Sequence, residues 1–262
     1  MKGIRVKILD LGYMEMEKQQ LVSGGGSSIT QSPITAVLIQ HPEAGWLLYD
    51  TGNDDAWETT YPAHVRETFR IKRLITIRQA LAAEGLEPKD ISRLVLSHLH
   101  LDHAGGLKFF QGTPAGRQVI VAEEEARDAF YRVNLTPDGI DGVYVRRLFC
   151  GLEGIGFSPM RGERKLVEGV TLFTQDSHTA ALIGMKVELE ETGPVIFCGD
   201  TVYTRESYEK QLPPGGELNS SSQRFLDNLN RLKQEAEVTH VSIFFGHDAQ
   251  QAAEWQAKGW IS

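Results

Sequence analysis

The chain has 262 residues, with 27 Lys and Arg against 35 Asp and Glu, so its formal charge at pH 7 is −8. This acidity argues against nucleic acid or an anionic membrane as the main partner, because both require a basic footprint. Two cysteines are too few for a disulfide scaffold. Lys2, Arg5 and Lys7 interrupt the N-terminus where a signal peptide needs an apolar core, and no stretch approaches the roughly 18 apolar residues of a membrane span. We therefore expect a soluble cytoplasmic protein.

Apolar runs of two kinds follow one another along the chain. Short runs rich in β-branched residues predict strands, and longer stretches with helical spacing predict helices between them. The predicted strands span residues 4–9, 34–40, 46–49, 93–97, 118–122, 170–174, 182–189, 195–198 and 241–245. The predicted helices span residues 77–84, 123–133, 223–235 and 249–258, and the third carries Phe225, Leu229 and Leu232 on one face.

The order of these elements indicates an α/β fold. Turns at residues 42–45 and 191–194 predict antiparallel hairpins, whereas strands alternating with helices predict helices that cover a sheet. An αββα sandwich, in which two mixed sheets face each other with helices on the outer faces, satisfies both.

Two segments lack any periodicity. Residues 21–33 are rich in glycine but lack the Lys-Ser/Thr of a phosphate-binding loop, so we expect a flexible loop there. Residues 134–165 are predicted to form loops near the mouth of a site.

One run of residues carries most of the chemical information. It follows a predicted strand and reads Ser97-His98-Leu99-His100-Leu101-Asp102-His103-Ala104-Gly105-Gly106. If the chain is extended, His98, His100 and Asp102 point the same way, and the chain turns at His103. Three imidazoles and a carboxylate suit zinc better than calcium or magnesium, which prefer oxygen ligands, and four candidates favour two ions. The alternative is a solvated His-rich turn or an adventitious metal patch.

Three further polar residues, His178, Asp200 and His247, follow predicted strands. The end of a buried strand is a usual position for site residues on a rigid scaffold. Taken singly, such a residue is more typical of a turn or a helix cap, and Asp248 is predicted to cap the helix at 249–258. Together with the run at 98–103, all three are expected to be metal ligands.

The run His98-Leu99-His100-Leu101-Asp102-His103, followed in order by His178, Asp200 and His247, resembles the metallo-β-lactamase superfamily over essentially the whole chain. Asp200-Thr201-Val202-Tyr203-Thr204 and Phe244-Phe245-Gly246-His247-Asp248 are similar to segments of its quorum-quenching branch, the N-acyl homoserine lactonases. The resemblance implies a single metallo-β-lactamase-like domain over residues 1–262.

The resemblance also implies a ligand set for two zinc ions, or for other divalent transition metals. One ion is assigned to His98, His100 and His178, and a second to Asp102, His103 and His247. Asp200 would bridge the two ions.

Two neighbouring positions bear on this assignment. Asp50, in Tyr49-Asp50-Thr51-Gly52, matches an early Asp-Thr-Gly that supports the ligands, although Asp50 by itself is equally typical of a turn. Where the family has Thr-Pro-Gly-His and then Ser/Thr-Pro-Gly-His, this chain has Gln175-Asp176-Ser177-His178-Thr179-Ala180-Ala181. This departure predicts a remodelled loop and leaves the exact substrate open.

The activity that the resemblance implies is opening of the ester ring of small lactones such as N-acyl homoserine lactones. A metal-bound hydroxide would attack the carbonyl, Tyr203 would polarise it, and Asp102 would protonate the leaving alkoxide. Tyr203 has an alternative role as a structural anchor, and Cys198 is expected to be a buried, inert thiol.

Two other functions stay open at this stage. One is hydrolysis of another ester or thioester, as in glyoxalase II, and the other is a metal-binding module without turnover. The sequence does not indicate the oligomeric state.

Overall fold

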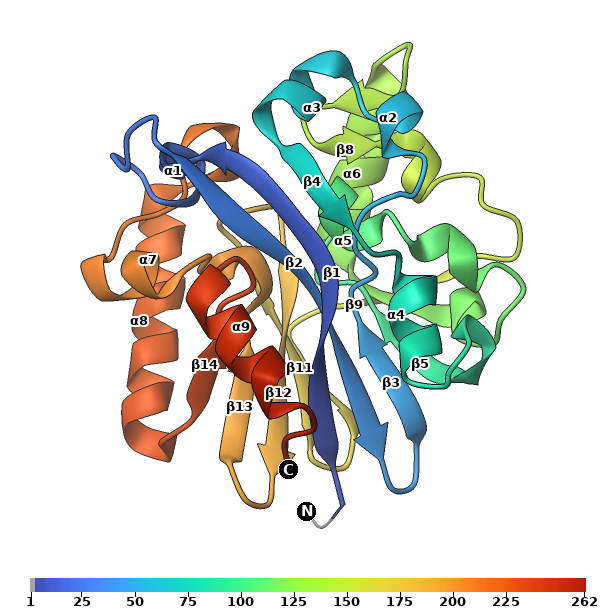
Figure 1. Cartoon of the computed structure of the whole chain (residues 1–262), viewed down its shortest axis with the longest axis vertical. Coiled ribbons are helices and arrows are strands. Elements are labelled where there is room, and N and C mark those ends of the chain that lie inside the picture. The colour runs from blue at the N-terminus through green and yellow to red at the C-terminus, as the bar shows by residue number, and fades with distance from the viewer. Residues whose placement is uncertain (1–2) are drawn as a thin grey trace.

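In the computed structural model, which describes residues 3–262 apart from the side chain of Glu217, two β-sheets face each other and helices pack on their outer faces (Figure 1). The larger sheet contains, in spatial order, β4 (Arg70–Leu74), β1 (Arg5–Glu17), β2 (Ile29–His41), β3 (Gly45–Tyr49), β5 (Ile91–Val95), β6 (Val119–Ala122) and β9 (Phe157–Met160). The smaller sheet contains β10 (Glu163–Val167), β11 (Val170–Gln175), β12 (Leu182–Leu189), β13 (Gly193–Phe197) and β14 (Ser242–Phe244). Met1 and Lys2, part of the charged N-terminus, lie outside the described residues.

Both sheets are mixed, as predicted. In the larger sheet β4, β1, β2 and β3 pair antiparallel, and β3, β5, β6 and β9 pair parallel. In the smaller sheet only the β13–β14 pair is parallel. The turns at 42–45 and 191–194 join β2 to β3 and β12 to β13 as the predicted antiparallel hairpins.

The longer helices are α4 (Ile77–Ala83), α6 (Glu123–Leu135), α8 (Ser222–Thr239) and α9 (Ala249–Lys258). Shorter ones are α1 (Lys18–Leu21), α2 (Trp57–Thr60), α3 (Ala63–Thr68), α5 (Leu101–Ala104) and α7 (Arg205–Lys210). A two-stranded ribbon, β7 (Ile140–Asp141) and β8 (Tyr144–Val145), follows α6. None of the helices in residues 3–262 is long and apolar enough to cross a membrane.

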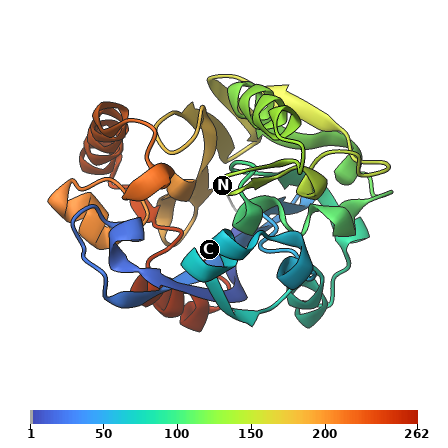
Figure 2. The same ribbon diagram turned by 90° about the horizontal axis from the view of Figure 1, so that it is seen from above.

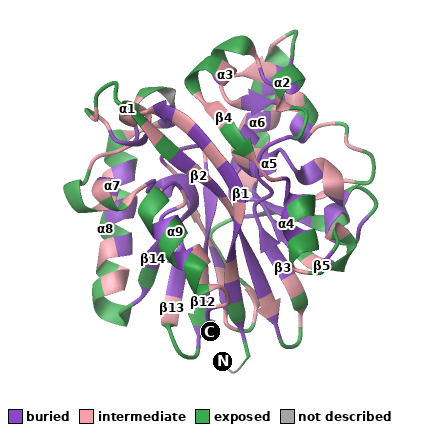
Figure 3. Ribbon diagram, viewed as in Figure 1, coloured by how far each residue is buried: buried purple, intermediate pink, exposed green. Residues whose placement is uncertain are grey.

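Side-chain alternation along the strands produces the layers. In β13, Val195 and Phe197 belong to the core between the two sheets, whereas Ile196 packs with Phe225 and Leu229 of α8 on the outer face. Seen from above, the orange-red α8 and the green α6 lie on opposite sides of the molecule (Figure 2). Buried residues line the strands, and exposed ones gather on the outer helices (Figure 3). The predicted αββα sandwich is confirmed.

Helix α9 closes one edge of the sandwich. Its Trp255 ring packs against Phe197 and Phe244, with centroids 6.3 and 5.2 Å apart. The predicted cap is also present, because the Asp248 side chain accepts a hydrogen bond from the Gln251 N–H at 2.9 Å.

Some predicted boundaries are wrong. The strand predicted to end at Leu9 continues to Glu17 as β1, through a bulge between Asp10 and Tyr13. Asp-Leu-Gly at 10–12 is typical of a turn, but here Gly12 has φ 98° and a Cβ on it would lie 1.9 Å from the Arg73 carbonyl oxygen. The neighbouring strand β4 was not predicted, because its basic residues suit a sheet edge rather than an apolar core.

The two segments without periodicity are only partly loops. The last five residues of the predicted loop at 21–33 are already in β2, which begins at Ile29. Residues 134–165 contain β7, β8, β9 and part of β10, so the loop prediction is wrong for these strands. These strands were not predicted because they are short and their apolar and polar residues alternate only weakly.

Candidate metal centre

The seven side chains predicted as ligands lie together, although they come from four separate segments of the chain. The first segment runs from the end of β5 into α5, and the others follow β11, β13 and β14. Six of the seven residues are buried, and the side chain of Asp102 is 12% exposed. The seven are His98, His100, Asp102, His103, His178, Asp200 and His247.

The local geometry of the run at 98–103 differs from the prediction. β5 ends at Val95 and His100 still has an extended backbone, but α5 begins at Leu101 and places Asp102 and His103 on one helical turn. His98 and His100 therefore group with His178, whereas Asp102 groups with His103 and His247. The prediction that Asp102 faces the same way as His98 and His100 is wrong.

Three imidazole nitrogens face one another in the first group. His178 Nε2 lies 3.2 Å from His98 Nε2 and 3.0 Å from His100 Nδ1. The outer nitrogen of His178 is 2.7 Å from the Leu218 carbonyl oxygen, which can only accept, so Nδ1 carries the proton and the Nε2 lone pair points inward. Burial lowers the pKa of His98, His100 and His178. Neutral imidazoles with converging lone pairs form a donor set that fits a zinc-class cation.

The second group, Asp102, His103 and His247, is arranged in the same way as the first but contains a carboxylate. His103 Nδ1 lies 2.8 Å from Asp50 Oδ2, and His247 Nδ1 lies 2.9 Å from Ser32 Oγ. Their Nε2 atoms face Asp102 Oδ2 at 3.7 and 3.9 Å. The outer nitrogens are thus held by neighbours while the inner nitrogens point at a carboxylate.

Asp200 lies between the two groups. Its Oδ2 is 3.4 Å from His178 Nε2 and 3.2 Å from His247 Nε2, and its Oδ1 is 3.3 Å from His103 Nε2. Within the described residues, neither Asp200 Oδ1 nor His103 Nε2 has a hydrogen bond of acceptable geometry, although both are buried. Buried polar atoms without partners are costly, and a shared cation between them would satisfy both. The residues present therefore fit a bound metal cation.

The charges in this second half shift several pKa values. Burial by itself would lower the pKa of His103 and His247, but the nearby carboxylates, Asp200 foremost, raise both above the ordinary value. Burial would likewise raise the pKa of Asp200, but His247 and His103 hold it well below its usual range. Asp200 is therefore a carboxylate at neutral pH.

Asp50 and Glu125, which are not among the seven candidate ligands, form hydrogen bonds that hold the chain beside these ligands in place. Asp50 accepts hydrogen bonds from the Ser97 N–H at 2.7 Å and the Ser97 hydroxyl at 2.8 Å, in addition to its contact with His103. Glu125 of α6, fully buried, accepts from the Leu99 N–H between His98 and His100 at 2.9 Å.

Glu125 also accepts a hydrogen bond from the Tyr144 hydroxyl at 3.1 Å, and the Tyr144 ring packs edge-on against His100. Glu125 was not predicted, because acidic residues in the first turn of a helix are common and give no separate signal. Only the fold brings it beneath the histidine run.

Tyr203 and Cys198 occupy distinct surroundings. Tyr203 is buried, and its hydroxyl lies 3.2 Å from His178 Nδ1. Burial raises the pKa of Tyr203 well above its ordinary value, so the hydroxyl keeps its proton and is available as a donor. Cys198 is fully buried, burial raises its thiol pKa to about 12, and Sγ lies 3.3 Å from the Phe244 carbonyl oxygen. This confirms that Cys198 is buried.

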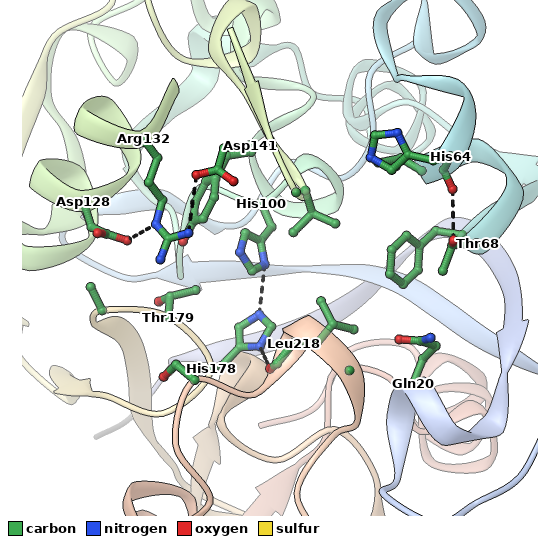
Figure 4. A pocket seen from close by; sticks show the side chains of 18 residues that line it. Gln20, His64, Thr68, His100, Asp128, Arg132, Asp141, His178, Thr179 and Leu218 are labelled. Atoms are coloured by element: carbon green, nitrogen blue, oxygen red, sulfur yellow. Dashed lines mark hydrogen bonds and ion pairs between the residues drawn. The ribbon is translucent and has the colours of Figure 1, made fainter. Parts of the chain in front are cut away.

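A cavity of about 390 Å³ opens on two members of the three-histidine group, His100 and His178. His100 and His178 lie at its centre, between one wall with Arg132, Asp128 and Asp141 and another with His64, Thr68 and Gln20 (Figure 4). Two further cavities of about 20 Å³ each are both lined by Asp102, Asp200 and His247. The centre thus has room for small species and access to a larger pocket.

Comparison with known proteins identifies the family. The profile of the metallo-beta-lactamase superfamily matches residues 29–247. This chain belongs to the metallo-β-lactamase superfamily. The predicted family is therefore confirmed, and with it the prediction of a metal-dependent hydrolase.

Within the superfamily, this chain is similar to lactonases. It is 29% identical over 232 residues to the N-acyl homoserine lactonase of Bacillus cereus, covering 84% of this chain and 82% of the relative. It is 27% identical to N-acyl homoserine lactonase AiiB of Agrobacterium fabrum, covering 96% of each chain. A solved structure of an N-acyl homoserine lactone hydrolase, with the product N-hexanoyl-L-homoserine bound at the catalytic metal center, superposes with a TM-score of 0.81 at 25% identity over 95% of each chain.

The loop before His178, where this chain departs from the pattern of the superfamily, is fixed by hydrogen bonds. The Gln175 side chain accepts from the Thr201 hydroxyl at 2.9 Å, and the Asn228 amide of α8 donates to the Asp176 carbonyl at 2.8 Å. The Ser220 N–H donates to the Ser177 carbonyl at 2.8 Å. These bonds, with the Leu218 carbonyl that anchors His178, hold the loop in place without the usual Pro-Gly.

Proposed function

We propose that this protein opens the ester ring of small lactones, N-acyl homoserine lactones among them, as a dizinc hydrolase. The observation that carries the proposal is the convergence of seven ligand side chains into two groups of three on either side of Asp200. His98, His100 and His178 would hold one ion, and Asp102, His103 and His247 the other. The similarity to lactonases over most of the chain supports the substrate class.

The chemistry that such ions supply when bound is a nucleophilic hydroxide at neutral pH, because coordination lowers the pKa of water from about 15.7 to about 7. The residues of the chain bind, orient and move protons around it. No Ser or Cys nucleophile is required, which agrees with the buried, protonated thiol of Cys198.

Tyr203 and Asp102 are the proposed catalytic residues. Their position supports these roles, because both line the same 20 Å³ cavity with Asp200. The Tyr203 hydroxyl, protonated and buried, would donate to the carbonyl oxygen as negative charge develops there. Asp102 has the most exposed carboxylate of the centre and would carry the proton to the leaving alkoxide.

The test is a hydrolysis panel on the metal-loaded protein. It contains N-acyl homoserine lactones of several chain lengths, simple γ- and δ-lactones, a glutathione thioester and a β-lactam. We expect ring opening of the lactones, read as acid release, and little turnover of the other two substrates. Preferred hydrolysis of the thioester would assign the glyoxalase-II-like function instead, and no turnover of any substrate would leave a metal-binding module. The cytoplasmic location stays a prediction from the sequence.

A further inference from the structure

One wall of the 390 Å³ cavity carries an ordered guanidinium group. Arg132 Nε donates to Asp128 Oδ2 at 2.6 Å within α6, and Nη1 lies 3.5 Å from Asp141 Oδ2 of β7. The guanidinium carbon lies 5.8 Å from the centroid of the Tyr144 ring. Helix, ribbon and aromatic ring thus fix the side chain from three sides, although 47% of it is exposed.

These contacts leave part of the donor capacity of Arg132 unused. A guanidinium has five N–H donors, and no hydrogen bond within the described residues uses Nη2. The group faces the cavity in which His100 and His178 lie (Figure 4). It is therefore positioned to donate to a molecule bound there.

The Tyr144 ring lies between Arg132 and the candidate ligand His100. Its centroid is 4.5 Å from that of the His100 ring and 5.8 Å from the guanidinium carbon of Arg132. A lactone with its carbonyl at the centre and its acyl chain running along this cavity would bring that chain past Arg132. In this orientation the wall would contact the variable part of the substrate.

The charges of the wall select the kind of substituent. One guanidinium is flanked by the carboxylates of Asp128 and Asp141, so a substrate carboxylate would be repelled. An unsubstituted alkyl chain would displace water from the guanidinium and return no hydrogen bond. A neutral oxygen acceptor avoids both penalties.

From this geometry we propose that Arg132 is a specificity-determining residue that selects lactones with a neutral oxygen substituent, such as a 3-oxo group, on the acyl chain. The inference rests on the proposed lactonase function and names the substrate class of the same site. A site that provides a hydrogen-bond donor discriminates against analogues that lack the acceptor.

The experiment compares pairs of N-acyl homoserine lactones of equal chain length, one unsubstituted and one 3-oxo substituted, on the zinc-loaded protein. We expect kcat/KM to be about 10-fold higher for the 3-oxo member of each pair, mainly through KM. In Arg132→Leu this ratio should fall to about 1, and in Arg132→Lys it should be intermediate, because an ammonium lacks the planar fork.

Arg127→Leu is the matched control. Arg127 lies on the same helix and pairs with Glu123 at the surface, and it does not line the cavity. It should keep the wild-type ratio. Three results would overturn the role of Arg132 while lactone opening itself stands. They are equal kcat/KM for both members of a pair in the wild type, a wild-type preference for the unsubstituted chain, or a ratio that changes by the same factor in Arg132→Leu and Arg127→Leu. Failure to open any lactone would overturn the proposed function together with this inference.

Discussion

The carboxylate of Asp50 lies 2.8 Å from Nδ1 of His103, and Asp50 itself has a left-handed backbone with φ 68°. Aspartate tolerates this conformation better than most residues with a side chain. Asp50 therefore combines a left-handed backbone directly after β3 with a contact to a candidate metal ligand.

Asp50→Asn tests this relationship, because asparagine tolerates the same backbone but removes the charge. We expect zinc affinity at the group of Asp102, His103 and His247 to fall about 10- to 100-fold, as is usual when the partner of a ligand histidine is altered. Competition with a chelator of known affinity measures the loss. Asp55→Asn, in a surface ion pair with Lys108, is the control. Unchanged zinc affinity in Asp50→Asn would show that His103 does not depend on Asp50.

Tyr203→Phe separates catalysis from metal binding. The change removes one hydroxyl and no ligand, so zinc content should stay the same while kcat on the best lactone falls roughly 10- to 100-fold. Tyr208→Phe, whose ring packs on Phe245 away from the centre, should behave like the wild type. If Tyr203→Phe keeps the wild-type kcat and KM, Tyr203 is a structural anchor only.

Glu125 should give the protein a measurable pH dependence of stability. Burial raises its pKa to about 7 from 4.5, so between these values the folded chain holds a proton that the unfolded chain has released. This carboxyl favours folding at low pH, and its contribution is lost as the pH rises through about 7. Glu125→Gln removes the dependence. The free energy of unfolding of Glu125→Gln minus that of the wild type should rise by about 2–3 kcal/mol from pH 5 to pH 8, because only the wild type loses stability as Glu125 ionises.

Urea unfolding of the two zinc-loaded proteins at several pH values measures this difference. Parallel pH profiles would mean that Glu125 titrates normally. Glu125→Ala adds a second readout, since it leaves the Leu99 N–H without a partner at a cost of about 1–3 kcal/mol that Gln should largely restore.

Acid should remove metal from the two groups unequally. Burial keeps the pKa of His98, His100 and His178 low, whereas nearby carboxylates raise the pKa of His103 and His247. A raised pKa means that protons compete with the cation at higher pH, so as the pH falls the group of Asp102, His103 and His247 should lose its ion first. Lactone opening should decline on the acid side with an apparent pKa of about 6–7. Zinc retention measured across pH 5–8 checks the order, and simultaneous loss of both ions would contradict it.

The sequence was informative where chemistry depends on residue type and order. The ligand candidates, the hairpins and the helix at 249–258 could be predicted, because histidine spacing, turn residues and apolar periodicity are local signals. The resemblance to the family implied which ligands share a group, and the structure brings the same residues together. Strand alternation alone could not predict this grouping, since it depends on α5 turning Asp102 away from His98.

The remaining features could not be predicted because they depend on contacts between residues far apart in the sequence. Glu125 is 26 residues from Leu99, and the wall of the cavity brings Arg132 of α6 together with Asp141 of the β7–β8 ribbon. In the sequence both read as surface residues of an ordinary helix. The strand β4 lacks an apolar pattern, and β1 passes through a glycine bulge that resembles a turn. These features are decided by tertiary contacts rather than by local preference.

The most direct test of the central claim is a zinc titration of the metal-free protein, with opening of an N-acyl homoserine lactone followed by acid release at each step. Two groups of three ligands around a shared Asp200 predict that activity rises until about two equivalents of zinc are bound and then stays constant. Asp200→Asn should bind less zinc and open the lactone more slowly. Full activity at one equivalent, or two bound equivalents with no lactone opened, would contradict a dizinc lactonase.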